Sequence, residues 1–212
     1  MPEPAKLQLV TDDSPAASPA IDVSNPWAPR HDVQFYENED VLFPSVGSFL
    51  ADGVRAGQPL IVIATASHRR AFADRLRSVG LDIDLLMHGR DVVWLDARET
   101  LDAFMEGPTP NRALFNATVG SVLDKLMAGR KYVVVRAYGE MVDLLWKDGN
   151  IEGAIALEEL WNDLAVKYSF SLLCAYAMDS SFKEADTHGF KQICRQHGRV
   201  VPTLGPATMG ID

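Results

Sequence analysis

The residues best suited to chemistry lie in one stretch of the chain, Tyr132–Asn162. It begins with an apolar run, Val133–Val135, and Arg136, Tyr138 and Glu140 follow within a few residues. A cation, a phenol and a carboxylate can together bind a polar or anionic molecule. Ligands of parallel α/β sheets bind at the carboxyl ends of strands, where the strand-to-helix loops open a crevice. We therefore expect this group at a ligand-binding edge; the alternative is that Glu140 favours a helix N-terminus and Arg136 pairs with a carboxylate.

Short apolar runs alternate with helical periods from His31 onward. The runs predict strands at His31–Tyr36, Leu60–Ala64, Asp91–Leu95, Lys131–Ala137 and Phe170–Ala175. The periods predict helices near 40–55, 67–76, 98–105, 111–127, 140–146, 150–167 and 186–197. Strands that alternate with helices indicate an α/β fold, here a three-layer sandwich around a mostly parallel central sheet.

Polar side chains would gather along one edge of that sheet, which we call the rim: the carboxyl ends of its parallel strands. A few polar groups among apolar walls make an ordinary small-molecule pocket. The predicted ligand-binding residues are Tyr36, Thr65, His68, Asp96, Arg136, Tyr138, Glu140 and Tyr176. The simpler alternative for Tyr36 and Tyr138 is that of half-buried edge aromatics whose hydroxyls reach water.

The sequence contains no motif for catalysis or phosphate binding. The patterns GxxxxGK[ST], GxGxxG and GxSxG are all missing. The loop after the first expected strand, 37–40, reads Glu-Asn-Glu-Asp, and three carboxylates there would repel a triphosphate. We therefore expect no catalytic residue, no cofactor and no enzymatic activity.

The histidines and cysteines are scattered, with neither HExxH nor CxxC spacing. His188 and His197 flank Cys194, which leaves a small metal cluster as an alternative, but histidines on helix surfaces are commoner, so we expect no metal site. Cys174 lies in an apolar run and is expected to pack as a small hydrophobe. His31 opens the first strand, at the end opposite the rim, and is expected to be structural.

The composition is that of an ordinary globular protein, with 47% hydrophobic and 23% charged residues. A net charge of -9 without any Lys/Arg run argues against direct binding to nucleic acid. The chain begins without the features of a signal peptide, and no apolar run approaches the roughly 20 residues that span a bilayer. We therefore expect a cytoplasmic protein that does not enter the membrane.

Three regions are expected along the chain. Residues 1–30 are rich in proline and should form a flexible leader, because such a segment cannot bury enough surface to offset its ordering entropy. Residues 31–202 should form one folded domain, and 203–212 a loose tail.

Four separated motifs, in order along the folded part, resemble the MEDS domain, a sensory domain named for methanogens, methylotrophs and the dichloromethane-responsive repressor. They are His31-x-x-x-Phe35-Tyr36, Arg136-Ala-Tyr-Gly-Glu-Met141, Leu157-Glu-Glu-Leu-Trp-Asn162 and Leu173-Cys-Ala-Tyr176. The resemblance implies a RecA/KaiC-like fold that has lost its phosphate loop. It also implies a signal-input module, often joined to histidine kinases or DNA-binding regions and suggested to sense small hydrocarbon derivatives. The sequence shows neither a kinase domain nor a helix-turn-helix, so we expect the output to lie in another polypeptide.

The leading hypothesis is thus a non-catalytic sensor of a small organic ligand, acting through a histidine kinase or transcription regulator in a bacterial or archaeal two-component-like pathway. One alternative is an interaction adaptor or anti-regulator without ligand. Another is a RecA-like protein with residual nucleotide binding. A homodimer stays open, since RecA-like domains often associate.

Overall fold

The computed structural model describes residues 28–178 and 187–201. Residues 1–27 of the expected leader and all of the expected tail, 203–212, lie outside the described residues. The boundaries proposed for these two segments therefore stay predictions.

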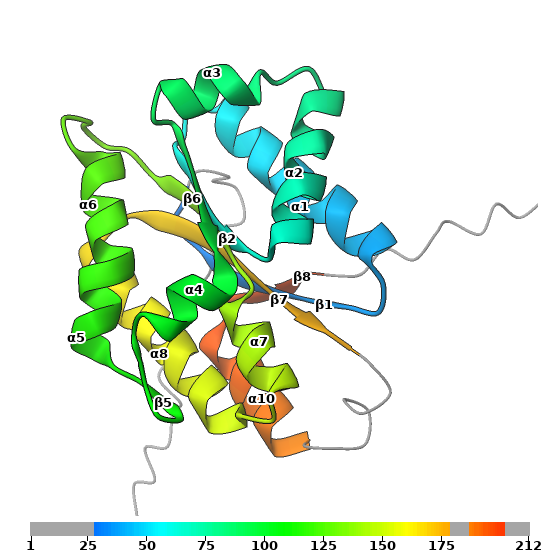
Figure 1. Cartoon of the computed structure of the whole chain (residues 1–212), viewed down its shortest axis with the longest axis vertical. Coiled ribbons are helices and arrows are strands. Elements are labelled where there is room, and N and C mark those ends of the chain that lie inside the picture. The colour runs from blue at the N-terminus through cyan, green and yellow to red at the C-terminus, as the bar shows by residue number, and fades with distance from the viewer. Residues whose placement is uncertain (1–27, 179–186, 202–212) are drawn as a thin grey trace, which may run out of the picture.

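Six parallel strands form the centre of the protein (Figure 1), in the order β3-β2-β6-β7-β1-β8. The predicted α/β sandwich is confirmed, and this central sheet is wholly parallel. The strands are β1 His31–Tyr36, β2 Leu60–Ala64, β3 Val92–Asp96, β6 Val135–Gly139, β7 Phe170–Ala177 and β8 Arg199–Val201.

Helices cover both faces of the sheet, so alternate residues of each strand face different cores. The α1 face, which packs residues such as Val62, Tyr138 and Leu173, is covered by α1 Glu39–Arg55, α2 Ala66–Ser78 and α3 Ile83–His88. The α8 face packs residues such as Ile63 and Leu172. Its helices are α4 Ala97–Asp102, α5 Arg112–Phe115, the π-helix η1 Asn116–Gly120, α6 Ser121–Met127, α7 Met141–Lys147, α8 Ile151–Lys167 and α10 Thr187–Gln196.

The strand β6 begins later than predicted, and this changes where its polar residues lie. The expected strand was Lys131–Ala137, but Tyr132 adopts φ 56° in an exposed loop and the strand starts at Val135. Arg136 then lies opposite Leu60, the first residue of β2. The strand ends two residues later than expected, at Gly139 beyond Tyr138, because β2 and β7 supply parallel partners there.

The connections of β2 and β6 leave the sheet on opposite faces. From β2 the chain enters α2 on the α1 face, whereas from β6 it enters α7 on the α8 face. Two adjacent strands whose connections diverge leave a crevice between their carboxyl ends, the usual ligand position in such sheets. The rim between β2 and β6 is therefore the first place to look for a site.

Short elements were missed in the sequence. These are β8, α3 and the antiparallel pair β4 Met105–Glu106 and β5 Thr109–Pro110. Each is too short to show a period, and tertiary partners decide its conformation. Within the described residues, no helix is long and apolar enough to cross a membrane.

The core on the α8 face is centred on Trp161, whose side chain is almost fully buried. Its ring makes edge contacts with Phe115 and Phe170, at centroid distances of 5.3 and 5.8 Å. These contacts join α8, α5 and β7.

Replacing Trp161 with Ala should lower the free energy of unfolding by about 3–5 kcal/mol, because a large cavity would remain. Urea denaturation measures this change. The matched control is Val166→Ala on the same helix, at a side chain that is 88% exposed, where the change should stay within about 0.5 kcal/mol. Equal effects of the two substitutions would contradict this description of the core.

Candidate functional site

The crevice between β2 and β6 is occupied by the carboxylate of Glu140. The backbone N–H of Glu140 donates to Ile63 O at 3.1 Å, which holds the residue against the end of β2. Its carboxylate accepts hydrogen bonds from the Thr65 N–H, from Tyr138 OH at 3.1 Å and from His68 Nδ1 at 2.6 Å. With its side chain only 3% exposed, Glu140 is a buried and well-partnered anion.

His68 links this buried carboxylate to the start of α1. Its Nδ1 faces Glu140, and its Nε2 lies 3.1 Å from Oε1 of Glu39, whose side chain is 59% exposed. Burial acts to lower the pKa of His68, but the hydrogen bonds and charges of Glu140 and Glu39 outweigh it, so the pKa is raised above 6.5. The contact of His68 with Glu39 joins α2 to α1.

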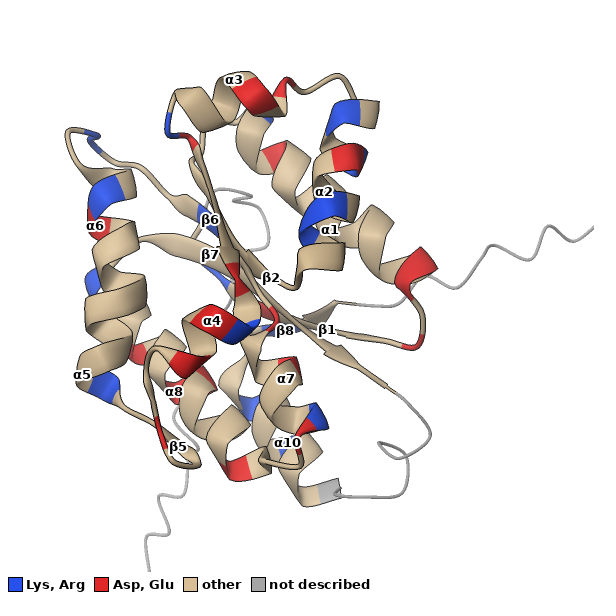
Figure 2. Cartoon of the chain, viewed as in Figure 1, with Lys and Arg blue, Asp and Glu red and all other residues tan. Residues whose placement is uncertain are grey.

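The crevice between β2 and β6 is accordingly filled by the protein's own side chains. A carboxylate at the N-terminus of α2 takes the place where a helix would otherwise attract an anionic ligand. Figure 2 shows acidic residues at the start of α1, near the same end of the sheet. This arrangement disfavours an anion between β2 and β6.

Several predicted site residues do meet at the rim. Thr65, His68, Tyr138 and Glu140 are joined by the hydrogen bonds above. Tyr36 lies on the same face and is buried, and burial, followed by the charges of Asp143, Glu140 and Glu39, raises its pKa.

Asp96, at the end of β3, caps α4 by accepting from the Arg98 and Glu99 N–H groups. It also pairs with Arg69 at 2.8 Å. Its contacts are therefore those of a helix cap and an ion pair.

The structure places Arg136 at the opposite end of the sheet, beside the first residue of β2, so its assignment to the rim was wrong. Tyr176 does lie at the carboxyl end of β7, but it faces the other helical layer from the crevice between β2 and β6. Arg136 Nε donates to Gln58 Oε1 at 2.8 Å, and the guanidinium lies 4.7 Å from the centroid of the Phe49 ring. These contacts are at the amino end of β6, and burial lowers the pKa of Arg136. Tyr176 faces the α8 side, where its hydroxyl donates to Glu158 Oε1 at 2.7 Å.

A cavity of about 500 Å³ lies between β1, β8 and the first turns of α1. The buried amide of Gln34 belongs to its lining and is 0% exposed. Neither its nitrogen nor its oxygen has a hydrogen-bond partner among the described residues. Its lining, which defines the Gln34 cavity, consists of Gln34, Asp40, Val41, Pro44, Ser45, Ser48 and Val201.

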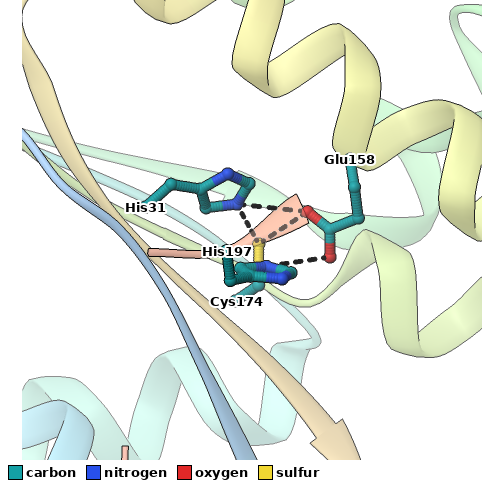
Figure 3. Close-up of side chains that lie close together, drawn as sticks. All are labelled: His31, Glu158, Cys174 and His197. Atoms are coloured by element: carbon teal, nitrogen blue, oxygen red, sulfur yellow. Dashed lines mark hydrogen bonds and ion pairs between the residues drawn. The ribbon is translucent and has the colours of Figure 1, made fainter. Parts of the chain in front are cut away.

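A second group of polar residues, the histidine cluster, is formed by His31, Glu158, Cys174 and His197 on the α8 face (Figure 3). One N, O or S atom from each lies within 4.8 Å of those of the others. The Glu158 carboxylate is fully buried; burial acts to raise its pKa, but His197 and His31 lower it overall. These are residue types that could hold a metal ion.

A profile of the family described as MEDS, the methanogen/methylotroph, DcmR sensory domain, matches residues 30–197. The match spans the sheet and both helical layers. The chain belongs to the MEDS family. Comparison with curated proteins gave no match. The resemblance inferred from the four motifs is thereby confirmed, and with it a role in signal sensing.

Sequence reasoning missed the most informative polar groups of this MEDS domain. Gln34 lies in β1 between Val33 and Phe35, and nothing nearby in sequence reveals that its amide is unpartnered. A signal did exist for the histidine cluster: Glu158 adjoins Leu157 in the core-facing stripe of α8, and a carboxylate there needs a buried cation or donor. Alternation along the strands also places His31 and Cys174 on that face.

Glu140→Gln should lower the pKa of His68, because the substitution removes the nearer of two anions. Because the pKa of His68 is higher in the folded protein than in the unfolded chain, its protonation stabilises the fold. This stabilisation is complete below the unfolded pKa of about 6.5 and is lost as the pH rises through the pKa of the folded state. The variant should lose less stability across that window than the wild type. Histidine NMR titration and urea denaturation at several pH values measure both effects.

The control for this experiment is Glu152→Gln, which removes an exposed carboxylate in the first turn of α8. It should leave the titration of His68 unchanged. An unaltered His68 pKa in Glu140→Gln would contradict the description of the rim.

Proposed function

We propose that this MEDS protein is a non-catalytic, cytoplasmic signal-input protein that senses a small organic molecule in the Gln34 cavity and signals through a regulatory partner protein. The observation that carries the proposal is the unpartnered amide of Gln34 beside a cavity of about 500 Å³. A buried polar group without a partner costs about 1–3 kcal/mol, so its retention calls for a reason beyond packing.

The lining of the cavity selects the chemistry of the ligand. A carboxamide both donates and accepts hydrogen bonds, and it pairs well with an amide, an alcohol or a protonated carboxylic acid. Val41, Pro44 and Val201 supply apolar contacts, and Asp40 disfavours an anion. A small neutral compound with one hydrogen-bonding group and a short apolar body fits both features.

The position of the cavity provides a route for the signal. Asp40 and Val41 line it, and both belong to the first turn of α1, next to Glu39. A ligand that shifts this turn changes the contact of Glu39 with His68 and therefore the relation of α1 to α2. A ligand can bias this contact only if it binds one arrangement of the helices better than the other. The outer surface of α1 and α2 is the proposed site for the partner, such as a histidine kinase or a transcription regulator.

An adaptor without ligand is the second candidate, and the self-filled crevice between β2 and β6 favours it. In that case the Gln34 cavity would bind none of the compounds tested, and partner binding would be independent of Gln34. The experiment below separates the two.

The substitution Gln34→Leu should have two effects at once. It should raise the free energy of unfolding by roughly 1–3 kcal/mol, and it should abolish ligand binding. The substitution removes two unpaired polar atoms and keeps a similar volume, which is neutral or stabilising when a buried group has no partner. Urea denaturation gives the stability. Ligand-observed NMR with small amides, alcohols and carboxylic acids gives the binding, and the side-chain amide signal of Gln34 should shift with each compound bound by the wild type.

The matched control is Gln192→Leu on α10, where the same substitution affects a side chain bonded to His188. It should keep all binding. Two results would contradict the proposal: the absence of any bound compound in the wild type, or binding that is retained in Gln34→Leu.

A further inference from the structure

We propose that the histidine cluster is a metal site, in which His31, Cys174, Glu158 and His197 bind one divalent transition-metal ion, with Zn²⁺ the best match. The site is on the opposite face of the sheet from the Gln34 cavity and is independent of it. Two imidazoles, a thiolate and a carboxylate form a ligand set that Zn²⁺ commonly takes with tetrahedral geometry.

Hydrogen bonding fixes which nitrogen of His31 is free. The Asn162 Nδ2 group donates to the backbone oxygen of Gln196 at 3.0 Å and to its side-chain oxygen at 2.9 Å. Its Oδ1 must therefore be the atom that faces His31 Nδ1, at 2.8 Å. Since Oδ1 can only accept, His31 carries its proton on Nδ1, and a neutral ring presents the bare Nε2 lone pair to the cluster.

The same reasoning applies to His197. Its Nδ1 lies 2.7 Å from the backbone oxygen of Ile193, again a pure acceptor, so the proton of the neutral ring is on Nδ1. Its Nε2 is buried and makes no hydrogen bond among the described residues. This nitrogen instead faces Glu158 Oε1 at 3.3 Å.

When both imidazole rings are neutral, each of the four side chains points an atom with a lone pair toward the same small volume. The thiol of Cys174 then carries the one proton that these four atoms share. The hydroxyl of Tyr176 donates to Glu158 Oε1 but cannot serve the two Nε2 atoms. Convergent lone pairs in a buried position repel one another unless a cation lies between them. Each outward Nδ1–H bonded to an oxygen is also the usual way in which metal-binding imidazoles are oriented.

Three of the distances within the cluster are close to those around a tetrahedral ion. Zinc bond lengths place ligand nitrogen and oxygen about 3.3 Å apart, and sulfur about 3.5 Å from either. Here His31 Nε2 lies 3.1 Å from Glu158 Oε2 and 3.4 Å from Cys174 Sγ. Cys174 Sγ lies 3.4 Å from the same oxygen. His197, the fourth member, offers a ligand atom within 4.8 Å of those of the other three.

Charge balance favours a divalent ion. A thiolate and a carboxylate carry two negative charges, so Zn²⁺ makes the buried site neutral when the Cys174 thiol releases its proton to solvent. Burial, followed by the charge and hydrogen bond of Glu158, raises the pKa of that thiol, so the bound ion itself must favour the thiolate. The competing metal-free arrangement is an ion pair between His197 and Glu158. Burial acts to lower the pKa of His197, but the charge and hydrogen bond of Glu158, with smaller contributions from Ile193 and Asp32, raise it overall.

The untagged full-length protein tests the proposal. Protein purified from zinc-supplemented culture should contain one equivalent of zinc by mass spectrometry of the metal. After chelation, titration with Co²⁺ should give the intense visible bands of a tetrahedral ion and a near-ultraviolet band from thiolate to cobalt. Cys174→Ser should lose the thiolate band and most of the zinc, whereas the control Cys194→Ser, at the other cysteine, should keep both.

A second pair of variants tests the orienting hydrogen bond. Asn162→Ala should weaken zinc binding about 10- to 100-fold, as expected when a group behind a ligating histidine is lost. Gln34→Leu, on the other face, should bind zinc as the wild type does, so failure of the ligand proposal leaves this one intact.

Three results would overturn the metal site. They are a wild type that neither retains zinc nor binds it after chelation, a cobalt spectrum of six-coordinate type without a thiolate band, and full zinc content in a folded Cys174→Ser variant. If Cys174→Ser does not fold, the wild-type cobalt spectrum decides alone.

Discussion

Helices cover both faces of the central sheet, and this constraint decides where the buried polar side chains of the protein find their partners. A side chain on a central strand cannot reach water from either face, so each polar one must find its partner among the helices of its own side. Alternation along the strand decides the side. Arg136 and Tyr138 therefore find partners on the α1 face, and Tyr176 finds Glu158 on the α8 face.

Two buried carboxylates illustrate how this constraint organises each layer. Glu140 accepts a backbone N–H, a phenol and an imidazole, and it binds the start of α2 to the end of β6. Glu158 lies between two imidazoles, a thiol and a phenol, and it joins α8 to both β1 and β7. The first lies in a crevice where ligands usually bind, and the second lies away from the rim. Position in the fold alone therefore does not identify a site.

The sequence was sufficient for the fold and only partly for the site. Strands β1 and β2 were predicted to the residue. β2 is apolar throughout and follows Gly57 and Pro59, whereas β1 mixes polar and apolar residues and ends before the acidic loop 37–40. The start of β6 was placed four residues early, since Val133 and Val134 look like strand residues but lie before the pairing region. That error put Arg136 at the wrong end of the sheet. The histidine cluster joins residues that are far apart in the chain. His31 is 143 positions from Cys174, and Glu158 is 16 positions from it. Local spacing alone could not have joined these residues, although a carboxylate beside the core-facing stripe of α8 indicated that a buried partner was needed.

The strand order also governs how the protein can be made. β1 lies between β7 and β8, and Asp32 pairs across to Arg199, 167 residues further along the chain. During translation the first strand of the described fold has no sheet neighbour until the last ones leave the ribosome, on the order of ten seconds later. Throughout that interval its apolar residues and free backbone groups are open to wrong pairing. The nascent chain should therefore depend on protection by chaperones, and folding should end, rather than begin, with the strand that is synthesised first.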